Sequence, residues 1–448
     1  MFSTLPHTPE DIEAMLSTIG VRSLEELFAD VPAELLLTRP LAIPPGATEP
    51  EVMRRLGTLA AANRTGAVSF LGCGSYDHLI PSVVEHLVSR SEFSTAYTPY
   101  QAEMSQGMLQ AIFEYQTMIA ELCALDVSNA SLYDGHTAVC EAAAMALAAA
   151  RKSRTILTSA TLHPHTRQLL RTHFSSLDVE LVEVRSRDGV TDQEDLGSKL
   201  GEGVAAVILQ SPNVLGYLED YGAASEAVHA CGALLVVSVN PVSLGVLQPP
   251  GEWGADIAVG DGQPLGIAQC FGGPSVGFIA AREGLLRRLP GRLVGESVDL
   301  EGRRAYLLTL QAREQHIKRE RATSNICSNQ ALMALAVTVH LSALGPQGLR
   351  EVGELCMRKA HYLEERLVRE LGLEPCSSAP FFNEFSVRLP RPPSEVLERM
   401  EQEGVLAGVD LGLLEPGRHA GVLTVAVTEK RTREELDRYV ELMGRALA

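Results

Sequence analysis

The stretch Ala233-Leu-Leu-Val-Val-Ser-Val239 is apolar on both faces, which is typical of a strand buried between two layers of helices. Similar apolar, β-branched runs precede it at residues 154–159, 178–184 and 204–210. Helical stretches separate these runs, at residues 164–175, 191–200 and 220–231. Strands and helices that alternate in this way form a mainly parallel sheet covered by helices. The sequence therefore predicts an α/β fold whose ligands lie beyond the carboxyl ends of the strands.

The two ends of the chain depart from this alternation. Residues 1–65 combine a helix start at Thr8-Pro9 with a group of prolines between positions 32 and 45. This pattern predicts a helical and extended arm that wraps a neighbour. Residues 66–328 are expected to form the large α/β domain. Residues 329–448 change to long helices and two strands, which predicts a smaller C-terminal α+β domain.

The charge of the chain excludes several classes of partner. Its 448 residues include 38 Lys and Arg against 56 Asp and Glu, which gives a net charge of −18. Such a surface repels nucleic acid and anionic lipid. The start of the chain does not have the pattern of a signal peptide, and the nearly apolar stretch Ala138–Ala150 is shorter than the ~20 residues of a membrane span. We therefore expect a cytoplasmic protein without a membrane or nucleic-acid partner.

Two local patterns raise the question of a metal or an anion site. His163-Pro164-His165 follows a predicted strand and offers two imidazoles, but no third ligand of matching spacing is visible. We therefore predict a helix start and no metal site. Asp134-Gly-His-Thr-Ala138 lies where a loop becomes an alanine-rich helix. Its free amides could bind a phosphate, and the alternative is an Asp N-cap without a ligand.

Two polar segments carry the pattern of an interface. The segment Glu92–Gly107 reads EFSTAYTPYQAEMSQG, and its two tyrosines favour a packed surface, because tyrosine joins an apolar ring to a polar tip. A merely structural loop is the alternative. The segment Thr323–Gln330 reads TSNICSNQ and precedes a predicted helix. Its alternative is an N-cap.

Long, ordered matches connect this sequence to a known family. The chain resembles the glycine cleavage system P-protein, and in particular subunit 1 of its two-subunit form. The matching segments are residues 8–20 (TPEDIEAMLSTIG), 92–107, 113–138, 249–266 (PPGEWGADIAVGDGQPLG), 271–278 and 289–332. His136 is a departure, because the family usually has a small residue there.

The resemblance implies both a fold and a reaction. The fold is the pyridoxal-phosphate-dependent transferase fold type I, or aspartate-aminotransferase-like fold, with a mainly parallel central sheet and a smaller C-terminal domain. The reaction is the decarboxylation of glycine, followed by transfer of the aminomethyl group to the lipoyl arm of the H-protein. This chemistry requires a lysine that binds the cofactor aldehyde and an acid that keeps the pyridine nitrogen protonated.

Neither group is present at the position that the resemblance implies. Ser238 ends the central strand where the acid is expected, and Pro264 stands where the lysine is expected. The chain has only five lysines, and all five are expected at helix ends or in solvated positions: Lys152, Lys199, Lys318, Lys359 and Lys430. No catalytic residue is therefore assigned to this chain, and we expect pyridoxal phosphate to lie on a homologous subunit 2.

The leading hypothesis makes this chain a complement to that subunit. The polar segments are then expected to line or buttress the partner's site, through Thr95, Tyr97, Thr98, Tyr100, Gln101, Thr323 and Asn325. One alternative is a self-sufficient pyridoxal-phosphate enzyme of the same fold. The other is a purely structural or regulatory subunit with no share in an active site.

Overall fold

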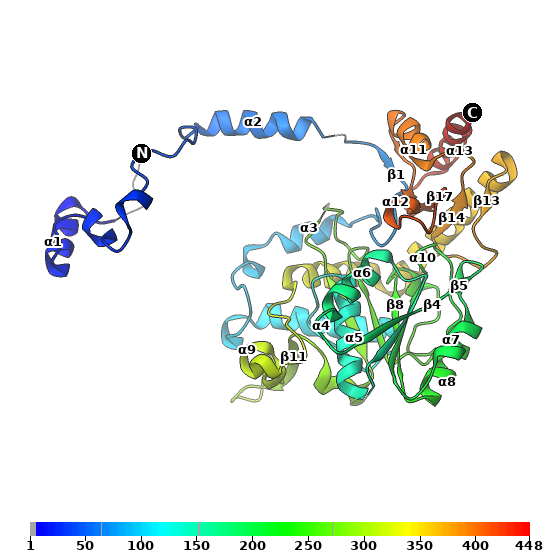
Figure 1. The fold of residues 1–448 in the computed structure, drawn as a ribbon, viewed down its shortest axis with the longest axis horizontal. Helices are drawn as coiled ribbons and strands as arrows, with labels where there is room; N and C mark the ends of the chain where they lie inside the picture. The colour runs from blue at the N-terminus through cyan, green and yellow to red at the C-terminus, as the bar shows by residue number, and fades with distance from the viewer. Residues whose placement is uncertain (1–5, 64, 151–152, 271) are drawn as a thin grey trace. The chain divides into compact units, whose positions relative to one another are not determined.

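A seven-stranded sheet forms the centre of the computed structural model, which describes residues 6–63, 65–150, 153–270 and 272–448 (Figure 1). The strand order is β2 (Val127–Ser128), β10 (Gly277–Ala281), β9 (Ile257–Asp261), β8 (Leu234–Val239), β7 (Val204–Ser211), β3 (Thr155–Ser159) and β4 (Glu180–Val184). From β9 to β4 all neighbours pair in parallel, and β10 is antiparallel to both β9 and β2. The predicted α/β fold is confirmed.

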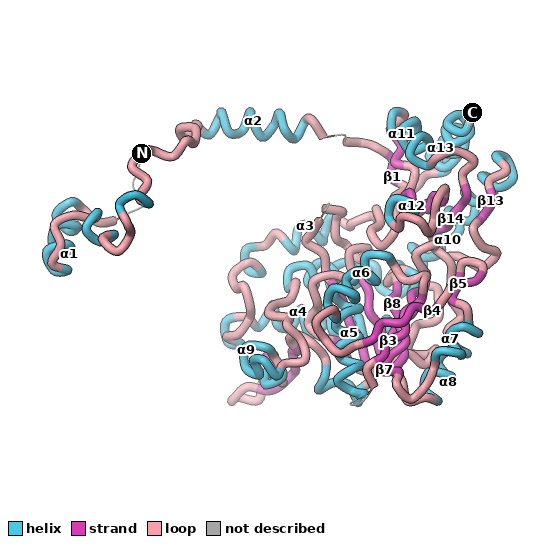
Figure 2. Tube along the Cα trace, in the orientation of Figure 1, coloured by secondary structure: helices cyan, strands magenta, loops and turns pink. Residues whose placement is uncertain are grey.

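Helices cover both faces of this sheet, and Figure 2 shows them around the strands. They are α4 (Gln106–Cys123), α5 (Gly135–Ala150), α6 (Pro164–Phe174), α7 (Gln193–Lys199), α8 (Gly222–Ala230) and α10 (Ala331–Leu371). Side chains of β8 alternate between two cores: Leu235 and Val237 pack with α4, α8 and α10, whereas Val236 packs with α5 and α6. A strand that is buried on both faces must be apolar at every position, as the sequence of β8 is.

The last part of the chain has a sheet and a core of its own. The strands β13 (Glu374–Pro375), β14 (Glu384–Arg388), β17 (Val422–Ala426) and β16 (Val409–Asp410) form a four-stranded antiparallel sheet. The helices α11 (Pro393–Gln402) and α13 (Arg433–Leu447) pack on it. We propose a domain division near residue 328, at the start of α10. The first half of this helix still packs in the core of the large sheet, and its later residues pack in the second core.

Shorter elements connect these layers. They are β1 (Val68–Ser69), which pairs with β15 (Val405–Leu406), the hairpins β5–β6 (Ser186–Arg187, Val190–Thr191) and β11–β12 (Leu293–Val298, Arg304–Thr309), and the helices α3 (Ser82–Val88), α9 (Gln315–Lys318) and α12 (Leu411–Leu414). The hairpin β11–β12 packs against α4, and Arg292 immediately precedes it.

Helix α10 is long and apolar enough, by length and composition alone, to cross a membrane. Its side chains Ala334, Val337 and Leu363 are fully buried in the cores of the protein. Gly345, with φ 63°, and Pro346 interrupt its helical geometry. Both halves therefore behave as core helices, and the break explains why the sequence pattern predicts two helices here.

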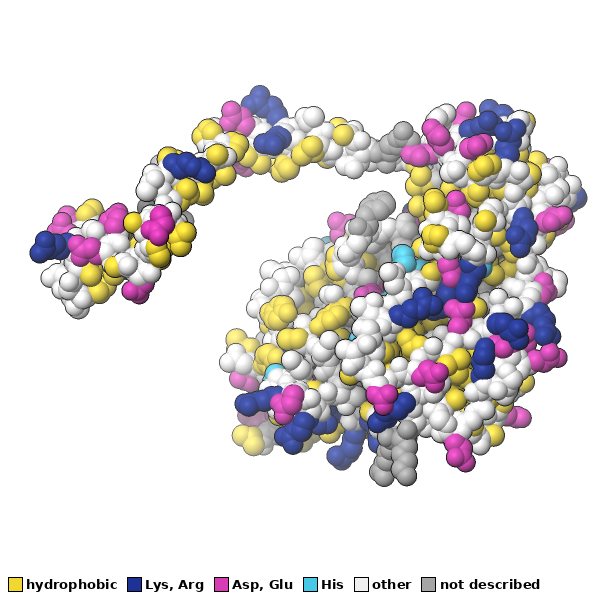
Figure 3. Space-filling model, viewed as in Figure 1, with side chains coloured by type: hydrophobic (Ala, Val, Ile, Leu, Met, Phe, Trp, Pro, Cys, Tyr) yellow, Lys and Arg dark blue, Asp and Glu magenta, His cyan; other side chains and the backbone are white. Residues whose placement is uncertain are grey.

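The N-terminal residues form one compact unit, Met1–Thr65, and the rest of the chain forms another, Gly66–Ala448. It contains α1 (Pro9–Ile19) and α2 (Glu49–Ala61), and none of residues 6–63 is buried. Many of its apolar side chains are exposed (Figure 3): Met15, Ile19, Leu24, Leu27, Phe28, Leu35, Leu37, Leu41, Ile43, Val52, Met53, Leu56 and Leu59. A surface of this kind indicates a protein partner.

A capping box begins the last helix, and it allows a stability prediction. The Thr432 hydroxyl accepts the Glu435 amide at 3.2 Å, and the Glu435 carboxylate accepts the Thr432 amide at 2.8 Å. Thr432→Ala is therefore expected to lower the free energy of unfolding by about 1 kcal/mol in urea titrations. Thr58→Ala, inside the exposed helix α2, is the control and should cause no loss. Equal losses in both variants would contradict the capping role.

Candidate functional site

The carboxyl edge of the large sheet holds the positions at which the cofactor-binding groups are expected. Ser238 lies in β8, opposite Gln210 of β7 and Val259 of β9. Pro264 lies in the loop that follows β9. Neither side chain has the chemistry required: a serine carries no charge to hold a pyridinium proton, and a proline has no amine.

A carboxylate that sequence reasoning missed occupies this edge. Asp261, the last residue of β9, accepts hydrogen bonds from the Gly135 amide at 2.9 Å, the Gln263 amide at 2.9 Å and the Ser275 hydroxyl at 2.5 Å. Burial nevertheless raises the pKa of Asp261. The sequence offers one signal for Asp261, its place at the end of a buried strand. Its hydrogen bond with the Gly135 amide could not be predicted, because the two residues are 126 positions apart.

At the start of α5, Asp134 caps the helix, as the N-cap alternative for this segment predicts. The Asp134 side chain accepts the Thr137 amide at 2.9 Å, and the Asp134 carbonyl accepts the Ala138 amide at 3.0 Å. With the Gly135 amide bound to Asp261, carboxylates already occupy the positive end of the helix. A phosphate would meet two negative charges here. The residues at this edge therefore do not fit pyridoxal phosphate.

The described lysines are bound elsewhere or exposed. Lys199 donates to the Glu183 carbonyl at 2.7 Å and to Asp195, Lys359 donates to the Glu429 carbonyl, and Lys430 donates to Asp77 at 2.6 Å. Lys318 is exposed at the end of α9. Lys152 lies outside the described residues.

The two polar segments lie around one buried ion pair that sequence reasoning missed. Arg292 and Glu314 are both buried, with Arg292 Nε 3.8 Å from Glu314 Oε2. Arg292 also donates to the Tyr100 hydroxyl at 2.8 Å, and its guanidinium lies 5.3 Å from the centre of the Tyr100 ring. Thr323 and Glu314 line the same surface cleft. The signal for Arg292 was its place in the segment 289–332, which carries the family resemblance.

The other residues of these segments face outward. Tyr97 is 85% exposed and Tyr100 is 54% exposed. Thr95, Gln101 and Asn325 are also exposed, whereas Thr98 is partly buried with a hydroxyl that has no hydrogen-bond partner among the described residues. The N-cap alternative for the second segment is wrong, because α10 begins after Gln330 without any side-chain cap. An exposed tyrosine held by a buried arginine, as Tyr100 is by Arg292, suits an interface.

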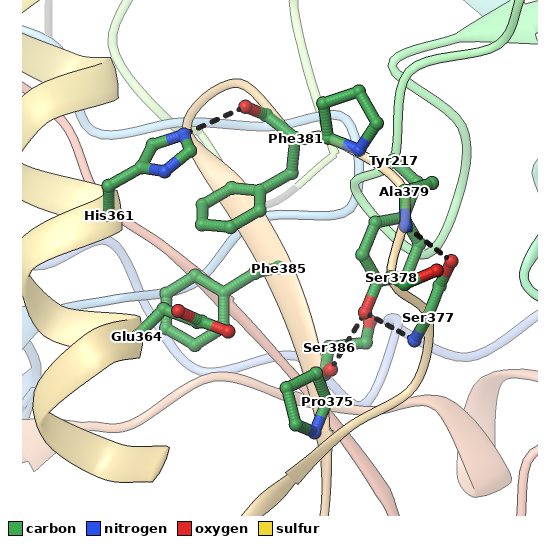
Figure 4. A pocket seen from close by; sticks show the side chains of 11 residues that line it. Tyr217, His361, Glu364, Pro375, Ser377, Ser378, Ala379, Phe381, Phe385 and Ser386 are labelled. Atoms are coloured by element: carbon green, nitrogen blue, oxygen red, sulfur yellow. Dashed lines mark hydrogen bonds between the residues drawn. The ribbon is translucent and has the colours of Figure 1, made fainter. Parts of the chain in front are cut away.

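A well-defined cavity lies elsewhere in the part of the chain that the structure describes. It has a volume of about 340 Å³ and is lined by Tyr217, His361, Glu364, Pro375, Ser377, Ser378, Ala379, Pro380, Phe381, Phe385 and Ser386 (Figure 4). The His361 ring stacks on Phe381 at 4.0 Å between ring centres. The Tyr217 hydroxyl donates to the Ser386 carbonyl at 3.2 Å. None of the predicted interface residues lines this cavity.

Comparison with known proteins agrees with the resemblance seen in the sequence. The chain is 52% identical over 441 residues to the "Probable glycine dehydrogenase (decarboxylating) subunit 1" of Carboxydothermus hydrogenoformans, with 98% of each chain covered. A crystal structure of glycine decarboxylase (P-protein) of the glycine cleavage system, in inhibitor-bound form, superimposes with a TM-score of 0.90 at 45% identity, over 100% of both chains.

A more distant structure bears on the fold alone. The sphingosine-1-phosphate lyase of Burkholderia pseudomallei K96243 matches with a TM-score of 0.66 at 14% identity, over 93% of this chain and 94% of the lyase. The predicted fold type I of pyridoxal-phosphate-dependent enzymes is confirmed. The glycine cleavage system P-protein family matches residues 3–443, and the chain belongs to this family.

Proposed function

We propose that this chain is subunit 1 of a two-subunit glycine dehydrogenase (decarboxylating) and that it completes a catalytic subunit 2. The whole enzyme decarboxylates glycine and transfers the aminomethyl group to the lipoyl arm of the H-protein. The relatives that carry the name of subunit 1 support this proposal over the full length of the chain. We place the enzyme in the cytoplasm.

One observation supports the assignment of the cofactor to subunit 2: the residues at the carboxyl edge of the large sheet lack the groups that bind it. Pyridoxal phosphate, when bound, supplies an electron sink for the pair left by the departing carboxylate. Pro264 and Ser238 offer no covalent anchor and no acid for it, and Asp134 and Asp261 occupy the end of α5. We therefore assign the cofactor to subunit 2.

The role of this chain is to bind subunit 2 and to present side chains to its site. The exposed apolar side chains of residues 6–63 support a wide protein contact. We expect Tyr97, Tyr100, Thr323 and Asn325 to contact the partner, and the exposure of these side chains and the bond from Arg292 to Tyr100 support this expectation. A heterotetramer of two copies of each subunit is the assembly that we propose.

Labelling with the cofactor tests this assignment. The purified chain is mixed with pyridoxal phosphate, reduced with borohydride and digested, and modified peptides are mapped. We expect no specific pyridoxyl-lysine in this chain, because the described lysines bind other groups or are exposed. After reconstitution with subunit 2, one labelled lysine should appear in subunit 2, together with glycine-dependent exchange of carbon dioxide. A stoichiometric label in this chain would instead support the self-sufficient enzyme.

A further inference from the structure

Three histidines meet at the carboxyl edge of the sheet, outside the interface described above. His136 lies in the first turn of α5, and His163 and His165 lie at the start of α6. The ring centres are separated by 4.8 Å for His136 and His163, 5.1 Å for His163 and His165, and 6.0 Å for His136 and His165. One nitrogen from each ring lies within 4.8 Å of the other two. The third imidazole that the sequence spacing lacked thus comes from a different helix.

Burial lowers the pKa of the two less exposed imidazoles. Burial, together with the neighbouring His136 and His165, lowers the pKa of His163 to about 3. Burial also lowers the pKa of His136. Only a neutral imidazole offers a lone pair to a metal ion.

Hydrogen bonds fix the orientation of two of these rings. Metal-binding histidines are usually oriented in this way, by a hydrogen bond from the ring nitrogen that does not bind the metal. His136 Nδ1 lies 2.7 Å from the Thr166 hydroxyl, which leaves Nε2 as the free atom. His163 Nδ1 accepts the His165 amide over a long 3.2 Å, and the ring also hydrogen-bonds the backbone of Cys73. A metal at Nδ1 would replace the weaker contact and retain the backbone bond as outer-shell support.

The charge around the cluster favours a cation. The carboxylates of Asp134 and Asp261 lie close enough to raise the pKa of His136 against the effect of burial. Anions are disfavoured at the same place, because these carboxylates occupy the end of α5. The cluster therefore combines three nitrogen ligands with two carboxylates near His136 and one cation, Arg167, near His163.

We propose that His136, His163 and His165 bind a divalent transition-metal ion, with Zn²⁺ as the test ion and water as the fourth ligand. Three imidazoles with one open position suit tetrahedral zinc, in which neighbouring ligand nitrogens are separated by about 3.4 Å. The His165 side chain is exposed, and binding of the ion would require it to move inward and close the remaining gap. This site is distinct from the proposed contacts with subunit 2.

A second group of metal-ligand residues has no such capacity. His78 Nδ1 lies 2.7 Å from Glu429 Oε2, and the Cys356 thiol donates to the same oxygen. The Leu79 amide binds the other oxygen at 2.6 Å. Burial raises the pKa of the Cys356 thiol well above its ordinary value, which keeps it protonated. The Glu429 carboxylate already has three hydrogen-bond contacts within this group, so the group serves as an internal control.

Metal binding by the full chain, stripped with chelator, tests the proposal. We expect one Zn²⁺ per chain by equilibrium dialysis, and a visible Co²⁺ spectrum of tetrahedral type. His136→Ala and His165→Ala should each weaken Zn²⁺ binding at least tenfold. The exposed His86→Ala and the buried Cys356→Ser should retain wild-type affinity. Circular dichroism checks that each variant is folded.

A second readout is the melting temperature with and without Zn²⁺. The ion should raise it for wild type and His86→Ala, and should not raise it for His136→Ala, since only a site present in the folded state stabilises. Zinc bound equally well by both cluster variants, or no stoichiometric zinc in wild type, would overturn the proposal. Both measurements are independent of glycine turnover and of subunit 2.

Discussion

Replacing Tyr100 by alanine is expected to lower the turnover number of the reconstituted two-subunit enzyme roughly hundredfold. The Tyr100 ring lies under the guanidinium of Arg292 and its hydroxyl accepts a hydrogen bond from that group at 2.8 Å. The variant removes an exposed aromatic contact and leaves a buried cation without one of its partners. Glycine-dependent carbon dioxide exchange measures the effect.

Conservative variants separate a positioning role from loss of fold. Tyr100→Phe retains the ring and loses only the hydrogen bond, so its turnover should lie between those of wild type and Tyr100→Ala. Tyr362→Phe, which removes a hydroxyl bound to Asp437 on another surface, is the matched control and should leave turnover unchanged. Size-exclusion chromatography should show that the complex persists in all three. Full activity in Tyr100→Ala would favour the purely structural or regulatory alternative.

The second large effect is expected from Glu384, which makes stability depend on pH. Its side chain is fully enclosed at the start of β14, where it accepts the Cys73 amide at 2.7 Å and the Tyr76 hydroxyl at 3.0 Å. Burial raises the pKa of Glu384 from 4.5 to about 7. No cation neutralises it among these contacts.

The direction of the pH effect follows from this raised pKa. Between pH 4.5 and 7 the folded state holds a proton that the unfolded state has released, so the free energy of unfolding falls as pH rises through this window. The contribution of protonated Glu384 to the free energy of unfolding is fully present below pH 4.5 and is lost above pH 7. The shift corresponds to about 3 kcal/mol.

Glu384→Gln tests this dependence because an amide is neutral at every pH and can bond both partners. The variant should gain up to about 3 kcal/mol over wild type at pH 8, and the gain should vanish near pH 4.5. Urea titrations across this range measure the difference. The exposed Glu398→Gln on α11 is the control and should follow wild type. A difference that is constant with pH would refute the buried-acid account.

Much of the fold is predictable from the sequence because its signals are local. The strands β3, β4, β7 and β8 lie within two residues of their predicted bounds, since an apolar run identifies a buried strand wherever the chain takes it. Helix α2 is different, because it lies in the region interpreted as a proline-broken arm. Its first turn begins with the box of Thr48 and Glu51, which the prolines before it obscured.

The candidate site was predictable in its segments and not in its contacts. The residues Tyr97, Tyr100, Thr323 and Asn325 follow from composition and from the family resemblance. That Tyr100 binds Arg292, 192 positions away, follows only from the pairing of distant elements. The sequence shows which residues are charged or polar, but it does not show which residue a buried charge contacts.

The sequence by itself determined the alternating α/β order, the acidic charge of −18 and the presence of Pro264 and Ser238 at the positions where we expect a cofactor enzyme to carry lysine and acid. The tertiary structure decided what occupies the sheet edge instead: Asp261 on the end of α5, and His136 against His163 and His165. The reason is geometric. A parallel sheet gathers the carboxyl ends of strands that are far apart in the chain, so the chemistry of that edge belongs to no single segment.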